Sequence, residues 1–465
     1  MNDRGFSKHW FSQEAATHGR RRSLRKLAPY LRLFLGVGAV AIALLLFEFG
    51  GTVLARFGQW QAEHSFAEAY PGAVLHIGKL DYAVRANRLV AQSVTVTTAD
   101  STFQVDRLSV TGVHWVGLLS GTAALAEALA AASLDITSLE VEFPQAHYGI
   151  RCARLQASVP NSALVAERCE LRALVGDEAF FAAHDFRATR FHVLVPACSV
   201  AGLAYADLLM GKSYHARSVR ISRPSVDALV DRDKPVDPAA TRPLMVHEAM
   251  AVIQPPMRID SFSISDGHLT YREQVVAGAD PGVLTFGAVS LSAAGITNRG
   301  DAATSILVRA QGTLMDAGTV NLMMSIPVKP PDFSLRYSGS LSAMDLTRLD
   351  AFLANAEHTR IKSGHAQGAT FEIEVTGGEA RGRVQATYEN LEIAFLDKQT
   401  GSENGLDHRV ASFLAKELKF RSSNGPDPPG SMKQGKVTYT KKPADEFLQF
   451  VWFALRSGAL DAVSQ

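Results

Sequence analysis

One segment of the sequence resembles a phosphate-binding loop. Residues 206–213 read ADLLMGKS, and a lysine and a serine follow a glycine in the same way in loops that hold nucleotide phosphates. Such a loop needs consecutive backbone N–H groups that turn inward, whereas residues 207–210 form an apolar helical run with an acidic side chain where phosphate would sit. We therefore expect a short helix here, and no nucleotide as a partner.

The pair His358 and His365, together with Glu357, comes closest to a metal site. Seven residues separate the histidines, and Ser363 and Gly364 lie between them, so the spacing fixes no common helix face. Two ordinary surface histidines account for the pattern more simply. The GxSxG, HExxH and CxxC motifs are also absent from the sequence. The sequence thus predicts a protein that is not an enzyme, with no catalytic residues, no metal and no cofactor.

Three cysteines are present, Cys152, Cys169 and Cys198. The residues around the first two read as two strands about a turn at Pro160-Asn161, and a two- or four-residue loop centred there sets Cys152 opposite Cys169. This pair can then form a disulfide, with Cys198 left over. A register shifted by one residue would instead place the two thiols on opposite faces and leave them free.

The elements that carry these residues are mostly strands. From residue 73 onward, apolar and polar side chains alternate with a period of two, which is typical of strands with one buried face. Tight turns such as Gly377-Gly378 favour antiparallel neighbours. Helical patterns are confined to residues 115–132, 201–210, 344–356 and 444–462. The predicted fold class is mainly β, a long antiparallel sheet with a few short helices.

The first 54 residues predict a membrane anchor. Residues 1–32 carry eight basic side chains against two acidic ones, and residues 33–54 form an apolar run broken by Glu48. At 1.5 Å per residue this run spans about 33 Å, which exceeds the roughly 30 Å hydrocarbon core of a bilayer. The positive-inside rule places the tail in the cytoplasm and the remaining mass on the other side. The alternatives are a cleaved signal peptide and a twin-arginine export signal at residues 21–26 (RRSLRK).

Composition divides the rest of the chain. The expected segments are a helical neck at 55–72, a β-rich region at 73–230, a linker rich in proline and charge at 231–256, a second β-rich region at 257–443 and an apolar helix at 444–465. In the last segment, Phe447, Phe450, Trp452 and Phe453 leave almost no polar face. This helix either caps the last strands or docks a partner.

The basic tail, the apolar segment and strands interrupted by short helices such as WVGLLSG carry a family resemblance. The segments FSLRYSGSLSAMDLTRLDAFL, RIKSGHAQGATFEIEV and GEARGRVQATYENLEIAFLDKQTG extend it towards the C-terminus. In these features the chain resembles a shorter branch of the AsmA-like proteins of Gram-negative envelopes, the superfamily that includes TamB. The resemblance implies a folded-over antiparallel sheet whose concave face is an apolar groove for lipids.

The resemblance also implies a single-pass inner-membrane protein with its main domain in the periplasm, which binds or transports lipids for envelope maintenance. Membrane lipids and other envelope proteins are the expected partners, while the near-balanced charge argues against nucleic acid. The residues expected to line the groove are Phe262, Ile264, Phe333, Leu335, Phe371 and Ile373. A closed sandwich produces the same alternation. In that alternative the chain is an envelope scaffold or assembly factor that recruits a partner through its C-terminal helix.

Overall fold

The computed structural model describes residues 59, 63–64, 66–68, 70–115, 117, 122–237, 243–276, 278–301, 303–330, 332–396, 420–426 and 432–464. Within them the protein is mainly β, with eighteen strands, mostly antiparallel, and a few short helices, as the sequence predicts. No helix of these residues is long and apolar enough to span a bilayer. The predicted tail and membrane helix, residues 1–54, lie outside the described part of the chain.

Contacts divide the chain into two compact units, of which the first comprises Met1–Ala99 and Gln104–Leu134. Here β1 (Val74–Ala83) and β2 (Arg88–Thr97) form an antiparallel hairpin around η1 (Val84–Ala86). Two side chains of the neck form hydrogen bonds with the backbone of Ile77 in β1. The N–H of Ile77 donates to Glu63 Oε1 at 2.8 Å, and the carbonyl of Ile77 accepts from the side-chain amide of Gln59. The bounds of the next elements are β3 (Thr102–Thr111), α4 (Leu125–Ala128) and β4 (Ser133–Phe143).

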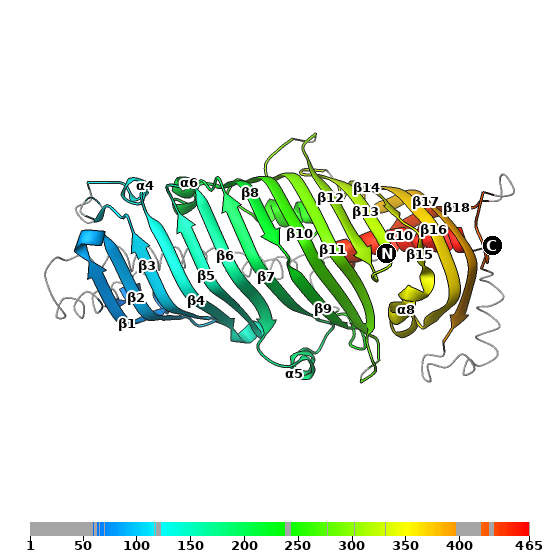
Figure 1. Ribbon diagram of the computed structural model, residues 1–465, viewed down its shortest axis with the longest axis horizontal. Coiled ribbons are helices and arrows are strands. Elements are labelled where there is room, and N and C mark those ends of the chain that lie inside the picture. The colour runs from blue at the N-terminus through cyan, green and yellow to red at the C-terminus, as the bar shows by residue number, and fades with distance from the viewer. Residues whose placement is uncertain are drawn as a thin grey trace, which may run out of the picture. The chain divides into compact units, whose positions relative to one another are not determined.

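The second unit, Asp100–Phe103 and Asp135–Gln465, holds a continuous sheet that runs from β5 to β18 (Figure 1). Its strands are β5 (Tyr148–Ser158), β6 (Ala163–Ala173), β7 (Thr189–Ala201), β8 (Tyr214–Ser222), β9 (Ser225–Asp231), β10 (Met257–Gln274), β11 (Gly282–Thr297), β12 (Ser305–Leu314), β13 (Gly318–Pro327), β14 (Leu335–Leu341), β15 (Met344–Asp345), β16 (Thr359–Thr376), β17 (Glu379–Phe395) and β18 (Gln434–Thr440). The helices are η2 (Pro144–Ala146), α5 (Asp177–Ala182), α6 (Tyr205–Leu209), α7 (Val246–Val252), η3 (Leu346–Leu349), α8 (Asp350–Glu357) and α10 (Phe447–Val463). Helices α4, α6, α8 and α10 overlap the four helical segments that the sequence predicts.

The hairpin of β5 and β6 has the register in which the two cysteines face each other. Cys152 and Cys169 are direct cross-strand partners, their Cα atoms lie 4.0 Å apart, and they form a disulfide. Cys198 is a free thiol. The first of the two alternatives for these cysteines is therefore the one found.

The segment between β9 and β10 is not a boundary between two sheets. Strands β8 and β9 both pair antiparallel with β7 and parallel with β10, so together they occupy the place of one long strand. Parallel neighbours need a crossover connection, and residues 232–256, which include α7, provide it. The segment expected as a linker at 231–256 therefore connects two neighbouring strands of one continuous sheet. The parallel pairing of β10 with β8 and β9 departs from the expected antiparallel order.

Several strands shift the phase of their alternation near the middle. In β10, Phe262 and Ile264 lie at even-numbered positions before Asp266, whereas Leu269 and Tyr271 lie at odd-numbered positions after it. Asp266 has the left-handed φ of +53° that accompanies a bulge. Asn390 of β17, at φ +55°, lies at a similar shift, and Tyr388 and Leu391 on its two sides belong to one buried cluster. A bulge of this kind lets apolar residues on its two sides share one face despite the change of parity.

Helix α10 covers the free edge of β18. The N–H of Lys436 donates to Asp461 Oδ2 at 2.7 Å, and the N–H of Thr438 donates to Ser457 Oγ at 3.2 Å. These side chains satisfy the outward backbone groups that would otherwise invite another strand. Gly458 allows the close approach, because a Cβ there would lie 2.6 Å from side-chain atoms of Val384 and Val437.

Candidate functional site

One face of the sheet in the second unit carries two rows of apolar residues. Residues directly opposite each other in a sheet point to the same face, so the strand registers trace each row from partner to partner. The first row is Ala157, Leu164, Val200, Val219, Phe262, Ala293, Val308, Met324, Tyr337 and Ile373. The second row is Leu155, Ala166, Cys198, Ile221, Ile264, Leu291, Ala310, Leu322, Gly339, Phe371 and Val384. We call the surface that these two rows form the apolar face.

The registers bring together residues that are far apart in the sequence. Phe262 and Ile373 belong to the first row, and Ile264 and Phe371 belong to the second. Leu335 precedes Tyr337 by two residues in β14, which places it on the same face. Phe333 lies just before β14 and packs against the same cluster of buried residues. All six predicted groove residues therefore share the apolar face.

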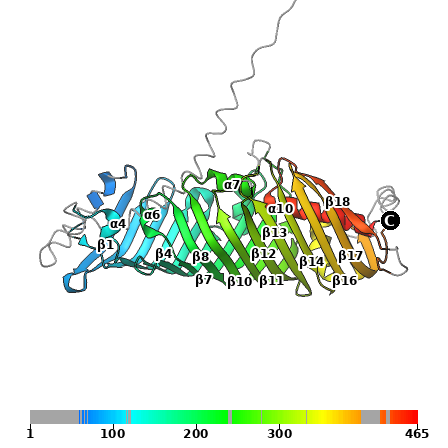
Figure 2. The ribbon, with the colours of Figure 1, turned by 90° about the horizontal axis from the view of Figure 1, so that it is seen from above.

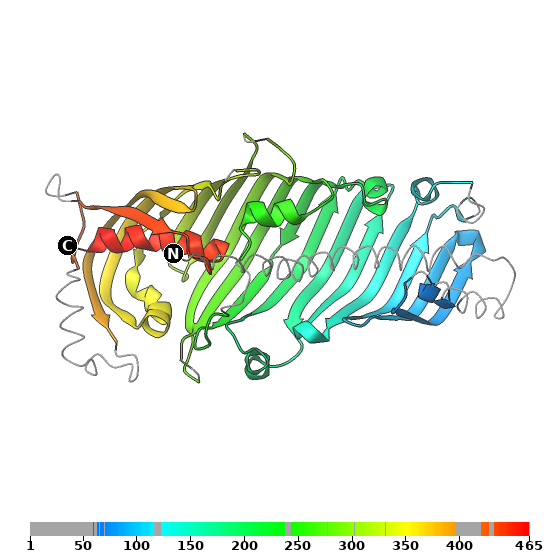
Figure 3. The same ribbon diagram turned by 180° about the vertical axis from the view of Figure 1, so that it is seen from behind.

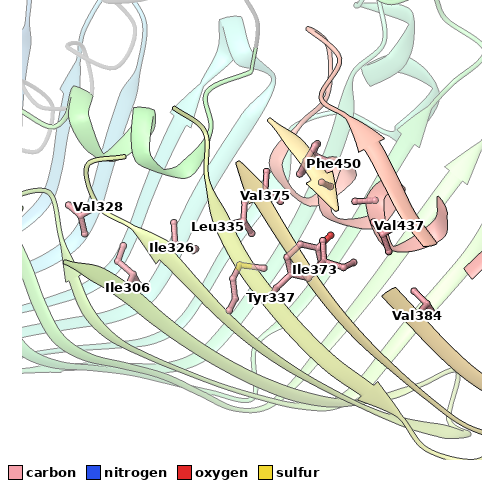
Figure 4. Close-up of a cluster of buried hydrophobic side chains, with 13 residues drawn as sticks. Ile306, Ile326, Val328, Leu335, Tyr337, Ile373, Val375, Val384, Val437 and Phe450 are labelled. Carbon is pink, nitrogen blue, oxygen red and sulfur yellow. The ribbon is translucent and has the colours of Figure 1, made fainter. Parts of the chain in front are cut away.

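Part of this face is closed. From β12 to β18 its side chains form a core with α10, in which Leu335 is 2% exposed, Ile373 1% and Phe450 0% (Figure 4). The hydroxyl of Tyr337 donates to the carbonyl of Val451 at 3.1 Å, which ties the helix to the sheet. Burial of this hydroxyl raises the pKa of Tyr337 well above its usual range.

Helix α7 extends the cover. It lies over the same face as α10 (Figure 2, Figure 3), and its Val246 and Met250 pack against the core. The ring of Phe333 lies between the two helices, with ring centroids 6.0 Å from His247 and 5.1 Å from Phe450.

The expectation of an open groove is therefore wrong for Leu335 and Ile373, and Phe333 is partly buried against the same core. Phe371 is partly buried against the same core, and its ring lies over the bare backbone of Gly339. Helices α7 and α10 cover positions that alternation alone cannot distinguish from an open surface.

A second part of the face is not sealed in this way. From β7 to β10 its side chains are half-buried, neither enclosed like Ile373 nor fully exposed. The members of this part, which we call the accessible stretch, are Cys198, Val200, Val219, Ile221, Phe262 and Ile264. Only the last two of these were found from the sequence. In β8, the alternation of Val219 and Ile221 with polar residues could have indicated this face, but the run is too short to distinguish it from the longer alternating strands.

The opposite face of the sheet carries many charged side chains, together with the exposed apolar side chains of Leu307 and Met323. Between β12 and β17 it carries a hollow of about 830 Å³. Ion pairs cross it, with Arg336 2.7 Å from Glu374 and Arg383 2.9 Å from Glu372. These side chains are well exposed, so the pairs contribute little to stability, and the hollow has the character of a solvated surface.

The C-terminal helix divides the four predicted docking residues between its two sides. Phe450 is fully enclosed in the core, and Phe447 is partly buried against it. Phe453 lies against Tyr439, with ring centroids 5.7 Å apart. Trp452 is 43% exposed and points outward. The prediction that Phe450 docks a partner is wrong, because the chain's own sheet already buries this ring.

The remaining chemical candidates lie in separate parts of the second unit. The ADLLMGKS segment includes α6, and the carboxylate of Asp207 accepts a hydrogen bond from Ser213 at 3.0 Å. His358 ends α8, whereas His365 lies in β16. Among the residues that the structure describes, no group of three His, Cys, Asp or Glu side chains is placed to hold a metal ion.

Buried charge does occur, at the far end of β10. Glu273 is 5% exposed, accepts a hydrogen bond from the Tyr271 hydroxyl at 2.9 Å and pairs with Arg232. Burial, reinforced by Glu273, raises the pKa of Tyr271 far above its usual range. Each group in this network has a partner, which favours a structural role for it.

Comparison with known proteins adds no family to this geometry. No protein-family model matches the chain, and no curated protein matches its sequence. The apolar face is therefore the feature from which a function is inferred.

Proposed function

We propose that this protein binds lipid acyl chains on the accessible stretch of its apolar face and does so without catalysis. The observation that carries the proposal is the continuity of the two rows, which run unbroken from a sealed core onto half-buried strands. Covering apolar surface gains about 25 cal/mol per Å², and contiguous apolar surface on a folded protein marks a binding site. An acyl chain is linear and apolar, and so matches a row of side chains in shape and chemistry.

The proposal extends to the setting in which lipids would be met. An AsmA-like protein anchored in the inner membrane by residues 33–54, with its sheet in the periplasm, would have lipids within reach. The basic tail and the apolar segment support this topology. The Cys152–Cys169 disulfide supports it weakly, because disulfides persist in oxidising compartments.

The topology predicts the redox state of these cysteines in living cells. Alkylation of intact cells before lysis should leave Cys152 and Cys169 unmodified until a reductant is added, because the pair is already oxidised in the periplasm. Mass spectrometry of the alkylated peptides makes the measurement. Cys198, alkylated after denaturation and without reductant, serves as the internal control for a free thiol. Alkylation of both residues without reductant would place the domain in a reducing compartment.

Cys198 also gives a direct test of lipid binding, because it is a free thiol within the accessible stretch. Bound lipid should cover it, so a maleimide should react at least several-fold more slowly when the purified protein is saturated with phospholipid. Burial already raises the pKa of this thiol, so the rates are compared at one fixed pH. The matched control moves the thiol to the exposed, opposite face, in the variant Cys198→Ser with Ala197→Cys. Equal protection at both positions would contradict a lipid on the apolar face.

One observation favours a second function, that of an envelope scaffold. On its outward side α10 presents Leu448, Trp452 and Leu460, which are 73%, 43% and 47% exposed. Exposed apolar side chains at helical spacing favour contact with a partner protein. If Cys198 gains no protection and no lipid accompanies the purified protein, the scaffold is the function that stands.

A further inference from the structure

The apolar face becomes charged next to the accessible stretch, towards the N-terminal ends of β8 and β10. In β8, Arg217 lies two residues before Val219, and in β10, Asp260 and Arg258 lie two and four residues before Phe262. A spacing of two keeps side chains on the same face of a strand. The apolar rows therefore give way to charged side chains on this same face.

Arg217 lies against a glycine, Gly202, at the end of the neighbouring strand β7. A Cβ at Gly202 would lie 2.5 Å from the Cβ and 3.4 Å from the Nε of Arg217, so the arginine side chain lies over the bare backbone of Gly202. Gly202 also has a φ of +69°, which a larger residue would adopt only with strain. Arg217 is exposed, and no ion pair engages it within the described residues.

Together with its neighbours, Arg217 forms a cluster with more positive than negative charge. Arg258 Nε donates to Asp260 Oδ1 at 2.6 Å, and His215 Nε2 lies 3.5 Å from Asp260 Oδ2. The hydrogen bond from Arg258, helped by His215, lowers the pKa of Asp260, which is therefore ionised at neutral pH. With two guanidinium groups against one carboxylate, the cluster has a net charge of +1 even when His215 is neutral.

We propose that Arg217 and Arg258 bind the anionic headgroup of a phospholipid whose acyl chains lie on the accessible stretch. This inference rests on the proposed function and assigns it a class of lipid. Adjacent strands are about 4.8 Å apart and residues two apart on a strand about 7 Å, so both long side chains can reach one phosphate. Arginine presents a fork of donors that matches phosphate oxygens. The headgroup then lies at the water-facing end of the rows, with the acyl chains over Val219 and Phe262.

The test compares two lipids that differ only in headgroup charge. Full-length protein in detergent micelles is titrated with fluorescently labelled phosphatidylglycerol and with phosphatidylcholine of the same acyl chains. Because a charge-assisted hydrogen bond gives about tenfold in affinity, the unmodified protein should prefer the anionic lipid by at least about tenfold. The double variant Arg217→Gln with Arg258→Gln should lose this preference and keep its affinity for phosphatidylcholine.

Arg220 supplies the matched control. It is exposed on the opposite face of β8, three residues from Arg217, so Arg220→Gln removes one positive charge without touching the apolar face. This variant should keep the full preference for phosphatidylglycerol.

The possible outcomes separate the two proposals. Equal binding of both lipids by the unmodified protein, or a preference that survives in the double variant, would overturn the headgroup site and leave acyl-chain binding in place. Loss of preference in Arg220→Gln as well would attribute it to overall charge, which also overturns the site. Binding of neither lipid by the unmodified protein would remove the proposed function and this inference together.

Discussion

Replacing Ile373 by aspartate is expected to lower the free energy of unfolding by about 4 kcal/mol. Ile373 is 1% exposed and lies beneath α10 in the closed core, so the new carboxylate would be buried without a partner and the isoleucine's packing would be lost. Chemical denaturation followed by circular dichroism measures the change. The control is Thr370→Asp, three residues away on the exposed, polar face of the same strand, which should cost less than about 1 kcal/mol.

The pH dependence of this variant gives a second check on burial. A buried carboxyl has its pKa raised above the unfolded value because burial penalises the charged form. A raised folded-state pKa means that the neutral acid is tolerated at low pH, and that stability is lost as pH rises through the folded pKa. The deficit relative to the unmodified protein should therefore be larger at pH 7 than at pH 4. A small deficit with no pH dependence would show that α10 does not seal this part of the face.

Local pattern was sufficient to predict which residues of a single strand share a face. Phe262 with Ile264, and Phe371 with Ile373, were assigned correctly to one face in their own strands because the pleat has a period of two. The pairing of Cys152 with Cys169 was one of two open alternatives, since it depends on a turn whose position the sequence marks well. These are short-range features, which depend on neighbouring residues alone.

The features that decide function are long-range, and local pattern does not reach them. Nothing in alternation indicates that Phe262 and Ile373 share a row, because the row depends on the registers of every strand between them. The bulge at Asp266 also changes the parity of alternation within β10, so counting in steps of two from Phe262 gives the wrong face for Leu269 and Tyr271. Alternation likewise gave no sign that α7 lies over this face beside Phe333.

One row of the sheet thus contains two environments. Val219 and Ile373 are members of the same row, yet Ile373 is sealed beneath a helix and Val219 is half-buried. A substitution that is identical in chemistry should therefore have opposite consequences at the two positions. This contrast separates lipid binding from a scaffold more sharply than either variant alone.

Val219→Asp is expected to keep the protein folded and to abolish lipid binding. The carboxylate can remain hydrated at a half-buried position, so the free energy of unfolding should fall by no more than about 1.5 kcal/mol, mostly from the poor strand propensity of aspartate. Bound acyl chains would instead cover the charge, at a cost of several kcal/mol, so affinity for phospholipid should fall at least about 100-fold. Denaturation and lipid titration of the same preparation make the two measurements, with Arg220→Asp on the opposite face as the control that keeps both properties. If Val219→Asp unfolds the protein as Ile373→Asp does, and no lipid accompanies the unmodified protein, the face is a closed core over its whole length and the scaffold replaces the lipid carrier.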